Sequence, residues 1–276
     1  VAANDRQKTI GSGASAKDVA VGGLMVAFGT GRNLTEDDRK TTNTNIQTLY
    51  SVLDNTRYRK NGTHLEVHPG GGTCPTGPDC VPVPAALGAG VAAAKLAKQT
   101  IATVSGSYAT VNATEELKTS TWKDYNGWYL DLPASGERLL KPMQFFDGSN
   151  ILAVYSESPT GTTEGGGGAS NESCSPSTIA TAPGAQYRTL VNIMDGKIPK
   201  VQLVDINGDH IYDGDDKKVA RAAVNTGTPM LITKGKRILD ATGKDLSKCK
   251  TDPTQCSEEL NRMPEQSLRP SWRQLK

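Results

Sequence analysis

The stretch Phe145-Phe-Asp-Gly-Ser-Asn-Ile-Leu-Ala-Val-Tyr155 places two apolar runs on either side of a four-residue polar turn. Asp, Gly, Ser and Asn are the residues that tight turns use, and Ile, Val, Phe and Tyr favour strands. The stretch therefore predicts an antiparallel β-hairpin. A second hairpin is predicted where Gln99–Val104 and Tyr108–Val111 flank Gly106.

Short apolar segments of the same kind recur along the chain and mostly end at Gly, Asn, Asp or Pro. They are Val21–Phe28, Ile46–Leu53, Thr63–His68, Gly127–Leu132, Glu137–Leu140, Val201–Val204, Thr228–Thr233 and Arg237–Leu239. Only Ala85–Lys98 has the Ala, Leu and Lys content of a helix, and two glycines weaken it. Many short strands and few short helices predict an all-β fold with long loop insertions.

The segment Thr160–Ala182 is rich in Gly, Ser and Thr and contains the run Gly165–Gly168. Such a composition buries too little apolar surface to offset the entropy of ordering it. We expect a flexible loop, which either joins two β segments or lies within one β domain.

The charge balance and the apolar runs exclude several functional classes. The 276 residues include 31 basic and 29 acidic side chains, and the net charge of +2 gives no electrostatic basis for binding nucleic acid or an anionic membrane. The apolar run Val19–Phe28 is too short to cross a bilayer, and Val81–Ala94 is interrupted by Pro82 and Pro84, so we expect no transmembrane segment.

The chain begins at Val1 without a signal peptide, which we interpret as a mature product or a fragment of a longer protein.

The segment Asp205-Ile-Asn-Gly-Asp-His-Ile-Tyr-Asp-Gly-Asp-Asp216 has the spacing of an EF-hand-type calcium loop. Calcium takes six to eight oxygen ligands, which a tightly coiled loop supplies from alternate side chains and one backbone carbonyl. The predicted Ca²⁺ ligands are Asp205, Asn207, Asp209, Asp213 and the carbonyl of Ile211, with Asp216 as a further candidate.

Two positions of this loop depart from the pattern. His210 stands at position 6, where Gly usually supplies a positive φ, and Asp216 replaces the bidentate Glu at position 12. The residues before the loop predict a strand, so the setting is strand–loop. The alternative interpretation is a polar Asn-Gly turn with solvated carboxylates, which five ligand-type residues in register make less favourable.

Four of the five cysteines form two close pairs in polar loops, Cys74 with Cys80 and Cys249 with Cys256. Short cysteine-closed loops containing Pro and Gly favour disulfides in an oxidising compartment. A zinc site formed by the first pair with His64 and His68, and unpaired thiols, are the alternatives. Cys174 is left over: it is either free or bonded to a segment outside this chain.

No catalytic constellation emerges from the remaining residues. Gly29-Thr-Gly-Arg32 lacks the Gly-Lys-Ser/Thr ending of a phosphate loop and is interpreted as a glycine turn. There is no Gly-x-Ser-x-Gly nucleophile elbow, and none of the three histidines lies beside a plausible nucleophile. Nothing in the sequence brings together any two of the carboxylates that could form a catalytic pair, namely Asp124, Asp131, Glu137 and Asp147. We therefore expect a protein that is not an enzyme.

Several stretches, taken in order, resemble the carboxyl-terminal region of the type IV pilus tip-associated adhesins, the PilC/PilY family. The resemblance spans about Val21 to Lys276. Each motif is weak alone, and the ordered set is more specific. The stretches are Phe28-Gly-Thr-Gly-Arg32 with Asp37-Asp38, Gln47-Thr-Leu-Tyr-Ser-Val-Leu-Asp54, Gly127-Trp-Tyr-Leu-Asp-Leu-Pro133, Gly136-Glu-Arg138, the calcium loop Asp205–Asp213, and Ser271-Trp-Arg-Gln-Leu275.

This resemblance implies a modified β-propeller, with residues 1–276 as its later portion and an open edge that needs earlier strands from a missing amino-terminal part. It implies a calcium-regulated adhesin module at the pilus tip, on the cell surface and associated with the outer membrane. Calcium occupancy would govern pilus extension and retraction, twitching motility and surface attachment. The implied partners are minor pilins of the tip complex and a host or abiotic surface.

Two other functions are weighed against this one. A generic calcium-stabilised extracellular β module could bind glycan or host protein. A quinoprotein-type propeller enzyme is suggested by Leu239-Asp-Ala-Thr-Gly-Lys244, but the three tryptophans, Trp122, Trp128 and Trp272, form no repeating docking pattern.

Overall fold

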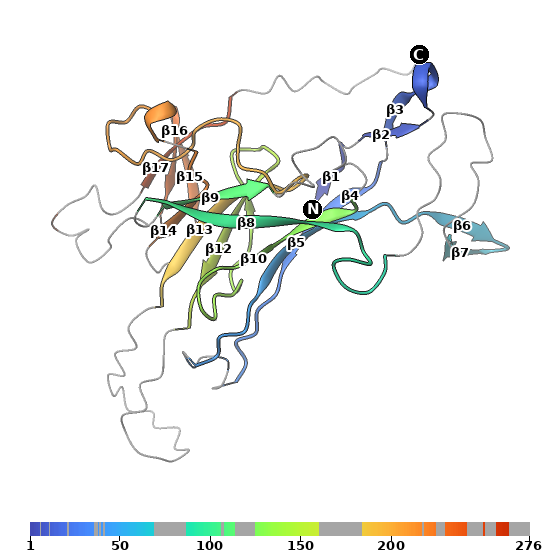
Figure 1. Ribbon diagram of the computed structural model, residues 1–276, viewed down its shortest axis with the longest axis horizontal. Coiled ribbons are helices and arrows are strands. Elements are labelled where there is room, and N and C mark those ends of the chain that lie inside the picture. Colours follow the sequence, from blue (N-terminus) through green and yellow to red (C-terminus); the bar gives the residue numbers. More distant parts are fainter. Residues whose placement is uncertain are drawn as a thin grey trace.

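The computed structural model describes residues 1–264 except 6, 11, 21, 36–37, 39, 41, 69–86, 106–107, 114–124, 160–183, 217, 225–229, 242–250 and 252–257. Within these ranges the regular secondary structure is almost wholly strand (Figure 1). The helical elements named among them are the short 3-10 turns η1 (Gly13–Ser15) and η3 (Gly214–Asp216), and Asp38 also has helical backbone. The all-β fold class that the sequence predicts is confirmed.

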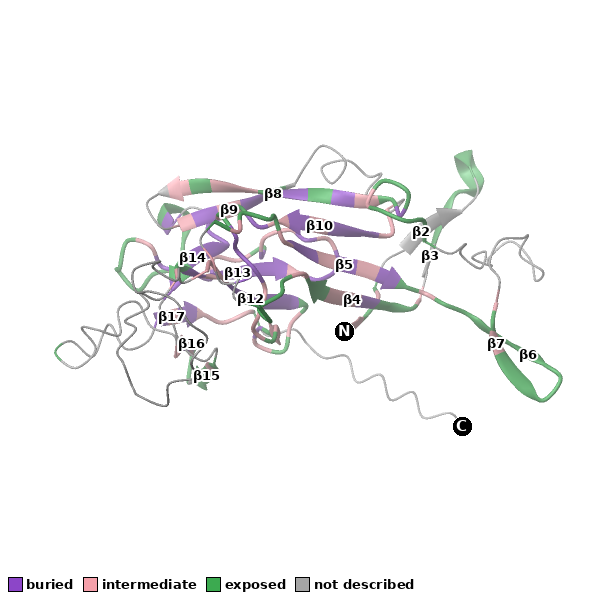
Figure 2. Cartoon of the chain, turned by 90° about the horizontal axis from the view of Figure 1, so that it is seen from below, coloured by how far each residue is buried: buried purple, intermediate pink, exposed green. Residues whose placement is uncertain are grey.

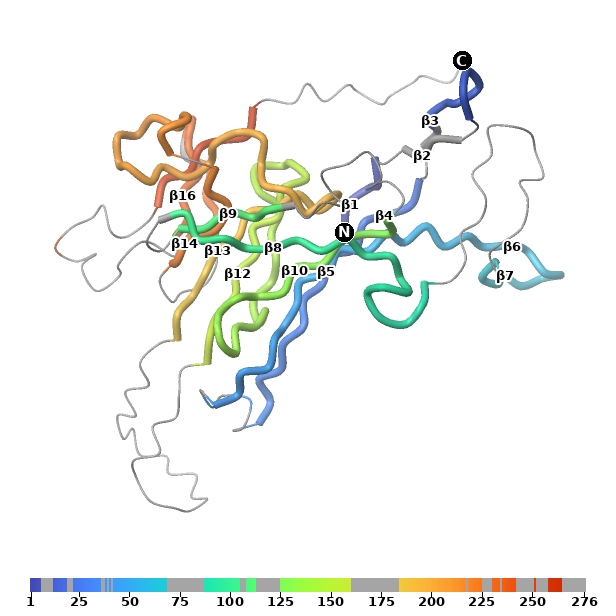
Figure 3. The backbone as a smooth tube through the Cα atoms, viewed as in Figure 1, coloured from blue at the N-terminus to red at the C-terminus, as the bar shows by residue number. Residues whose placement is uncertain are grey.

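A curled ten-stranded sheet forms the body of the protein, in the spatial order β1-β4-β5-β10-β8-β9-β14-β13-β12-β11 (Figures 1 and 3). Its neighbours are antiparallel apart from β10 and β8, which run parallel. The curl is compatible with a propeller-like β fold. The strands are β1 (Ala2–Ala3), β4 (Leu24–Gly29), β5 (Thr48–Asp54), β8 (Leu96–Ser105), β9 (Tyr108–Ala113), β10 (Gly127–Asp131), β11 (Gln144–Phe145), β12 (Ile151–Glu157), β13 (Gln186–Asn192) and β14 (Arg221–Val224).

Three smaller sheets accompany the large one. A three-stranded sheet contains β15 (Leu231–Lys234), β16 (Arg237–Asp240) and β17 (Glu258–Asn261). Two hairpins project from the body in Figure 1: β2 with β3, and β6 with β7. Their bounds are Gln7–Ile10, Lys17–Ala20, Tyr58–Asn61 and His64–Val67.

Both predicted hairpins are confirmed. β8 pairs antiparallel with β9, and β11 pairs antiparallel with β12 across the turn at Asp147–Asn150. Two predicted strands are reduced to single bridges. Val204 bridges Leu260 at the end of the segment predicted at Val201–Val204. Arg138 bridges Glu157 in the segment predicted at Glu137–Leu140.

The helix predicted over Ala85–Lys98 is wrong in its described part, residues 87–98. The chain turns through 91–95, with Lys95 at a φ of 52°, and β8 begins at Leu96. β8 has β10 on one side and β9 on the other, so its backbone groups find ladder partners along both edges. These tertiary hydrogen bonds outweigh the modest helix propensity of Ala and Lys.

Two apolar clusters form the core (Figure 2, purple). One is centred on Trp128, which is fully buried and donates from its indole Nε1 to the carbonyl of Ile193 at 2.9 Å. Gly196 lies against this indole, and a Cβ there would come within 2.5 Å of the ring. The second cluster packs Tyr155 and Leu190 of the large sheet against Leu260 of the three-stranded sheet.

A buried ionic cluster also joins these two sheets. The Arg188 side chain on β13 is 1% exposed and contacts Asp240 at 2.6 Å and Glu258 at 2.8 Å. The Tyr155 hydroxyl donates to the same Asp240 carboxylate at 3.1 Å. Burial alone would lower the pKa of Arg188, but the carboxylates of Glu258 and Asp240 raise it, so the guanidinium stays charged.

We expect Arg188→Met to lower the free energy of unfolding by about 3–5 kcal/mol, because two carboxylates would remain buried without their cation. Urea denaturation at pH 7 measures this loss. The triple change Arg188→Met with Asp240→Asn and Glu258→Gln should recover part of it, since no unpaired charge is then left.

The matched control is Arg59→Met, which removes the exposed Arg59–Glu66 ion pair of the β6–β7 hairpin. Its effect should be much smaller than that of Arg188→Met, because solvent screens an exposed ion pair. An Arg188→Met loss no larger than that of the control would contradict the structural role of the cluster.

Candidate metal-binding loop

The predicted loop begins directly after Val204 and ends at η3, before β14. Asp205 lies at its base and is 8% exposed. Its two carboxylate oxygens accept hydrogen bonds from the backbone N–H of Gly208 at 2.6 Å and of His210 at 2.9 Å. These bonds coil the chain around the first predicted ligand.

The next oxygen-bearing side chains each bind the amide two residues further along. Asn207 accepts from the N–H of Asp209 at 2.9 Å, and Asp209 accepts from that of Ile211 at 2.7 Å. Asp213 accepts from the N–H of Asp215 at 2.9 Å. Such side chain-to-backbone turns are typical of Asp and Asn, and here they repeat at the alternate positions that the sequence predicts as ligands.

His210 adopts the backbone conformation expected of position 6. Its φ is 62°, a left-handed value that Gly normally supplies and that His tolerates better than most residues. The turn is therefore made without Gly at this position, as predicted. Gly208, two residues earlier, has a φ of 82°.

Asp216 has a different place from the other carboxylates. It is fully buried, and its two oxygens accept from the N–H of Ile206 at 2.8 Å and of Asp213 at 3.1 Å. The side chain thus ties the start of the loop to its end. This geometry makes Asp216 a clamp on the loop, and the role of a further ligand that the sequence suggests for it stays a prediction.

The donor set of the loop is all oxygen, as a hard divalent cation requires. In the described ranges, no three His, Cys, Asp or Glu side chains converge at the spacing of a metal site. The side-chain oxygens are instead turned toward amides of their own loop. A carboxylate oxygen that accepts one N–H keeps a further lone pair for a cation, so the residues fit a calcium ion chemically.

The loop is fastened to the three-stranded sheet by two side chains. Arg237 on β16 donates to the carbonyl of His210 at 3.1 Å, and its guanidinium lies 4.5 Å from the centre of the Tyr212 ring. The Tyr212 hydroxyl donates to the carbonyl of Glu259 on β17 at 3.0 Å. Burial, with smaller contributions from nearby charges, raises the pKa of Tyr212 to about 12, so this hydroxyl keeps its proton at neutral pH.

The other predicted sites are placed only in part. His64 lies exposed on β7, and the backbone N–H of His68 donates to the carbonyl of Arg57. The predicted disulfides Cys74–Cys80 and Cys249–Cys256, the zinc alternative and Cys174 fall outside the described residues. The predicted flexible loop, Thr160–Ala182, lies outside them as well.

The carboxylates weighed as a catalytic pair lie in separate ion pairs. Asp131 pairs with Lys98 at 3.2 Å. Glu137 is fully buried and pairs with Arg221 at 2.8 Å. The third, Asp147, pairs with Arg262 at 2.9 Å, and Asp124 lies outside the described residues.

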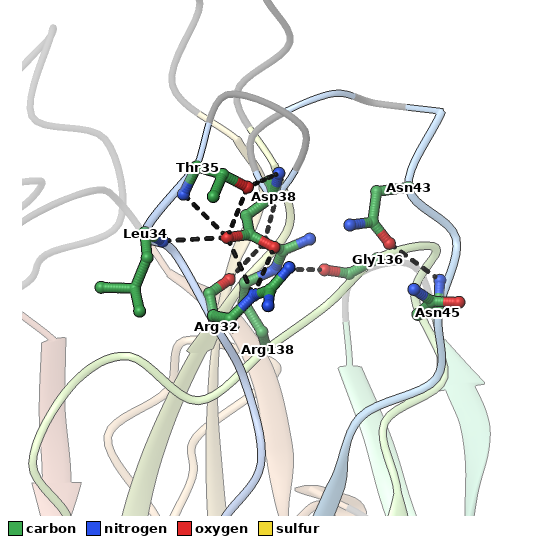
Figure 4. Close-up of polar contacts among 8 residues, drawn as sticks. All are labelled: Arg32, Leu34, Thr35, Asp38, Asn43, Asn45, Gly136 and Arg138. Atoms are coloured by element: carbon green, nitrogen blue, oxygen red, sulfur yellow. Dashed lines mark hydrogen bonds and ion pairs between the residues drawn. The ribbon is translucent and has the colours of Figure 1, made fainter.

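Two of the motifs that carry the family resemblance meet in space (Figure 4). Arg138 is buried and donates from one guanidinium nitrogen to the carbonyls of Arg32, at 2.7 Å, and of Asp38. Its Nε donates to the carbonyl of Gly136 at 3.1 Å. Gly136 has a φ of 64°, and a Cβ there would come within 2.4 Å of the Asn43 carbonyl, so this position requires Gly.

Asp38 completes this contact. Its carboxylate accepts from the N–H groups of Thr35 at 2.9 Å and Leu34 at 3.0 Å, and from Arg32 at 3.0 Å. The Thr35 N–H is the main cause that holds the pKa of Asp38 well below its usual range. Burial acts in the opposite direction, and Arg32 lowers the pKa further.

Comparison with known proteins gives structural neighbours but no sequence match. No family model matches the chain, and no curated protein matches it. The fold is similar to the crystal structure of the Pseudomonas aeruginosa PilY1 C-terminal domain, with a TM-score of 0.48 and 16% sequence identity. The match covers 88% of this chain and 42% of that one, so this chain spans less than half of its neighbour's length. No helix in the described ranges is long and apolar enough to cross a membrane.

We expect Asp38→Asn to destabilise the protein at pH 7, with a difference from wild type that shrinks in acid. The pKa of Asp38 is lowered by folding, so its stabilisation is fully present above the unfolded value near 4 and declines as the pH falls toward the folded value. Chemical denaturation of both proteins from pH 7 down to about pH 2 measures the difference. A gap between the two proteins that stays constant across this range would contradict the assignment.

Proposed function

We propose that the protein is a calcium-binding β module in which the loop 205–216 holds Ca²⁺. The observation that supports this most directly is the coil of the loop around Asp205. This carboxylate accepts the amides of positions 4 and 6, and position 6 has the positive φ of a calcium loop.

The ligands of the ion would be the predicted set of oxygen donors, with Asp216 as the clamp that holds the loop ends together. Bound calcium would supply positive charge to a loop that carries several carboxylates within a few residues. In the absence of a cation these carboxylates repel one another. The set consists of Asp205, Asn207, Asp209, Asp213 and the carbonyl of Ile211.

We further propose that this module acts in a type IV pilus, at the tip and on the cell surface, where calcium would regulate pilus extension and retraction. Its partners would be minor pilins and a host or abiotic surface. The support is the ordered set of family-like motifs. Two of these motifs, around Arg32 and around Gly136, are joined through Arg138. The proposed role is not enzymatic, since each candidate catalytic carboxylate within the described part of the chain has its own cation.

We expect isothermal titration calorimetry to show calcium binding in preference to magnesium, with a Kd of roughly 10⁻⁵–10⁻³ M. Asn207 removes one negative charge from the usual set, and the bidentate Glu is missing. Magnesium demands a tighter octahedron and releases its water reluctantly. Asp209→Ala should weaken calcium binding by at least tenfold, or about 1.4 kcal/mol.

The matched control is Asp215→Ala, which removes the same charge from the same loop at a position that supplies no ligand. It should change the affinity far less than Asp209→Ala does. Equal calcium binding by wild type and Asp209→Ala would refute the site. Equal weakening by both variants would mean that calcium binding reflects the general negative charge of the loop and does not use Asp209 as a ligand.

In the organism, we expect Asp209→Ala to alter pilus extension or twitching motility while the β fold remains intact. Circular dichroism of the purified variant checks the fold, and motility on agar checks the function. If a strain whose protein has lost calcium binding keeps normal motility, the proposed role in the pilus is contradicted. The proposal that the loop binds calcium is unaffected by that result.

A further inference from the structure

A pocket of about 330 Å³ opens beside the turn that follows β13. This volume lies at the lower end of the range for small-ligand sites, about 300–1,000 Å³. The pocket shares no residue with the loop 205–216, and its lining combines carboxylates, lysines and aliphatic side chains. They include Asp5, Asp195, Lys197, Lys200, Ile151 and Ile198.

The turn that carries Asp195 is fastened by side chains from three other strands. Trp128 on β10 and Ser51 on β5 both donate to the carbonyl of Ile193, at 2.9 and 2.7 Å. Gln99 on β8 donates to the carbonyl of Asp195 itself at 2.8 Å. The backbone at the pocket is therefore set before a ligand arrives, and binding requires little further ordering.

The Asp195 carboxylate is only partly compensated. One oxygen accepts from the backbone N–H of Lys197 at 3.1 Å, and the other lies 3.9 Å from the Lys197 ammonium group, which is too long for a hydrogen bond. The side chain is 21% exposed. Burial raises the pKa of Asp195, the contacts with Lys197 offset this only in part, and Asp5 raises the pKa further. A second ammonium group at this carboxylate would be stabilised.

The other charged groups balance the pocket. Asp5 follows Asn4, whose backbone N–H and side-chain amide donate to the carbonyls of Gly23 and Gly22. Lys200 is exposed. Two carboxylates and two ammonium groups leave the lining without net charge, so a ligand with charge of one sign alone would be repelled by one of the two pairs. A ligand with both signs is complementary.

An apolar wall completes the pocket. Ile151, at the start of β12, is 4% exposed, and Ile198 packs against the Trp128 cluster. Met263 lines the pocket as well, and its backbone N–H donates to the Asp147 carboxylate at 2.9 Å. This wall suits an aliphatic group, since burying methylene groups against it is favourable.

We propose that this pocket binds a free aliphatic α-amino acid. Its ammonium group would contact Asp195, its carboxylate Lys197 and Lys200, and its side chain the wall at Ile151 and Ile198. The α-amino acid is favoured over longer zwitterions because its two charged groups sit on one carbon, and the opposite charges of Asp195 and Lys197 are likewise only 3.9 Å apart. This binding site is independent of the proposed calcium site.

The test titrates L-leucine into the complete, isotope-labelled protein and follows the backbone amide signals by NMR. We expect saturable shifts at residues 195–200, with a Kd of about 1 mM or lower. N-acetyl-L-leucine lacks the ammonium group, and L-leucinamide lacks the carboxylate. Each should bind at least about tenfold more weakly than leucine.

Asp195→Asn keeps the shape of the side chain and removes its charge, and it should weaken leucine binding by at least about tenfold. The matched control is Asp131→Asn, because Asp131 is also partly exposed and pairs with a lysine, Lys98, at 3.2 Å. This control should bind leucine as wild type does. Lys200→Gln tests the exposed side of the pocket in case Asp195→Asn does not fold. It should weaken the binding of leucine and leave that of leucinamide unchanged.

Four outcomes would overturn the proposal. The first is no saturable binding at about 10 mM leucine. The second is binding that leaves the signals of residues 195–200 unmoved. The third is equal binding of leucine and either blocked analogue, which would show that one of the two charged groups is not recognised. The fourth is a loss in Asp131→Asn as large as that in Asp195→Asn, which would indicate a general effect of charge.

Discussion

The buried guanidinium of Arg188 is the contact on which the arrangement of the two sheets depends. It comes from β13 of the large sheet, and both of its carboxylate partners belong to the three-stranded sheet. Its Nε and one terminal nitrogen have no hydrogen-bond partner, so the cluster is not fully satisfied. A buried ion pair of this kind is weak as a source of stability, but separating its members is costly. We infer that its main effect is to fix one docking geometry between the sheets.

The candidate calcium loop depends on that docking geometry. The loop starts at Val204, whose bridge partner is Leu260 of β17, and Tyr212 is fastened to the same strand. On the other side, Arg237 of β16 holds the carbonyl of His210. A change in the loop on binding a cation would therefore reach the three-stranded sheet through Tyr212 and Arg237. Those contacts give the loop a physical route to the rest of the molecule.

The sequence predicted local features better than long-range ones. Both hairpins were predictable because their turn residues and strands are adjacent in the chain, and the positive φ of His210 followed from its position in the loop. The helix expected at Ala85–Lys98 was wrong, since pairing with β10 decides that segment from 31 residues away. Strand β13 was missed, because Gln186, Arg188 and Thr189 make a central strand look polar. Their partners Asp240 and Glu258 lie too far along the chain to be paired with Arg188 from the sequence.

A crystal structure determined in millimolar calcium would show whether the coil around Asp205 is a calcium site. We expect one ion in the loop, with Asp216 still accepting the amides of Ile206 and Asp213. An empty loop in that structure, or an ion held elsewhere in the chain, would refute the calcium site. The ligands expected in that density are oxygens of Asp205, Asn207, Asp209 and Asp213 and the carbonyl of Ile211.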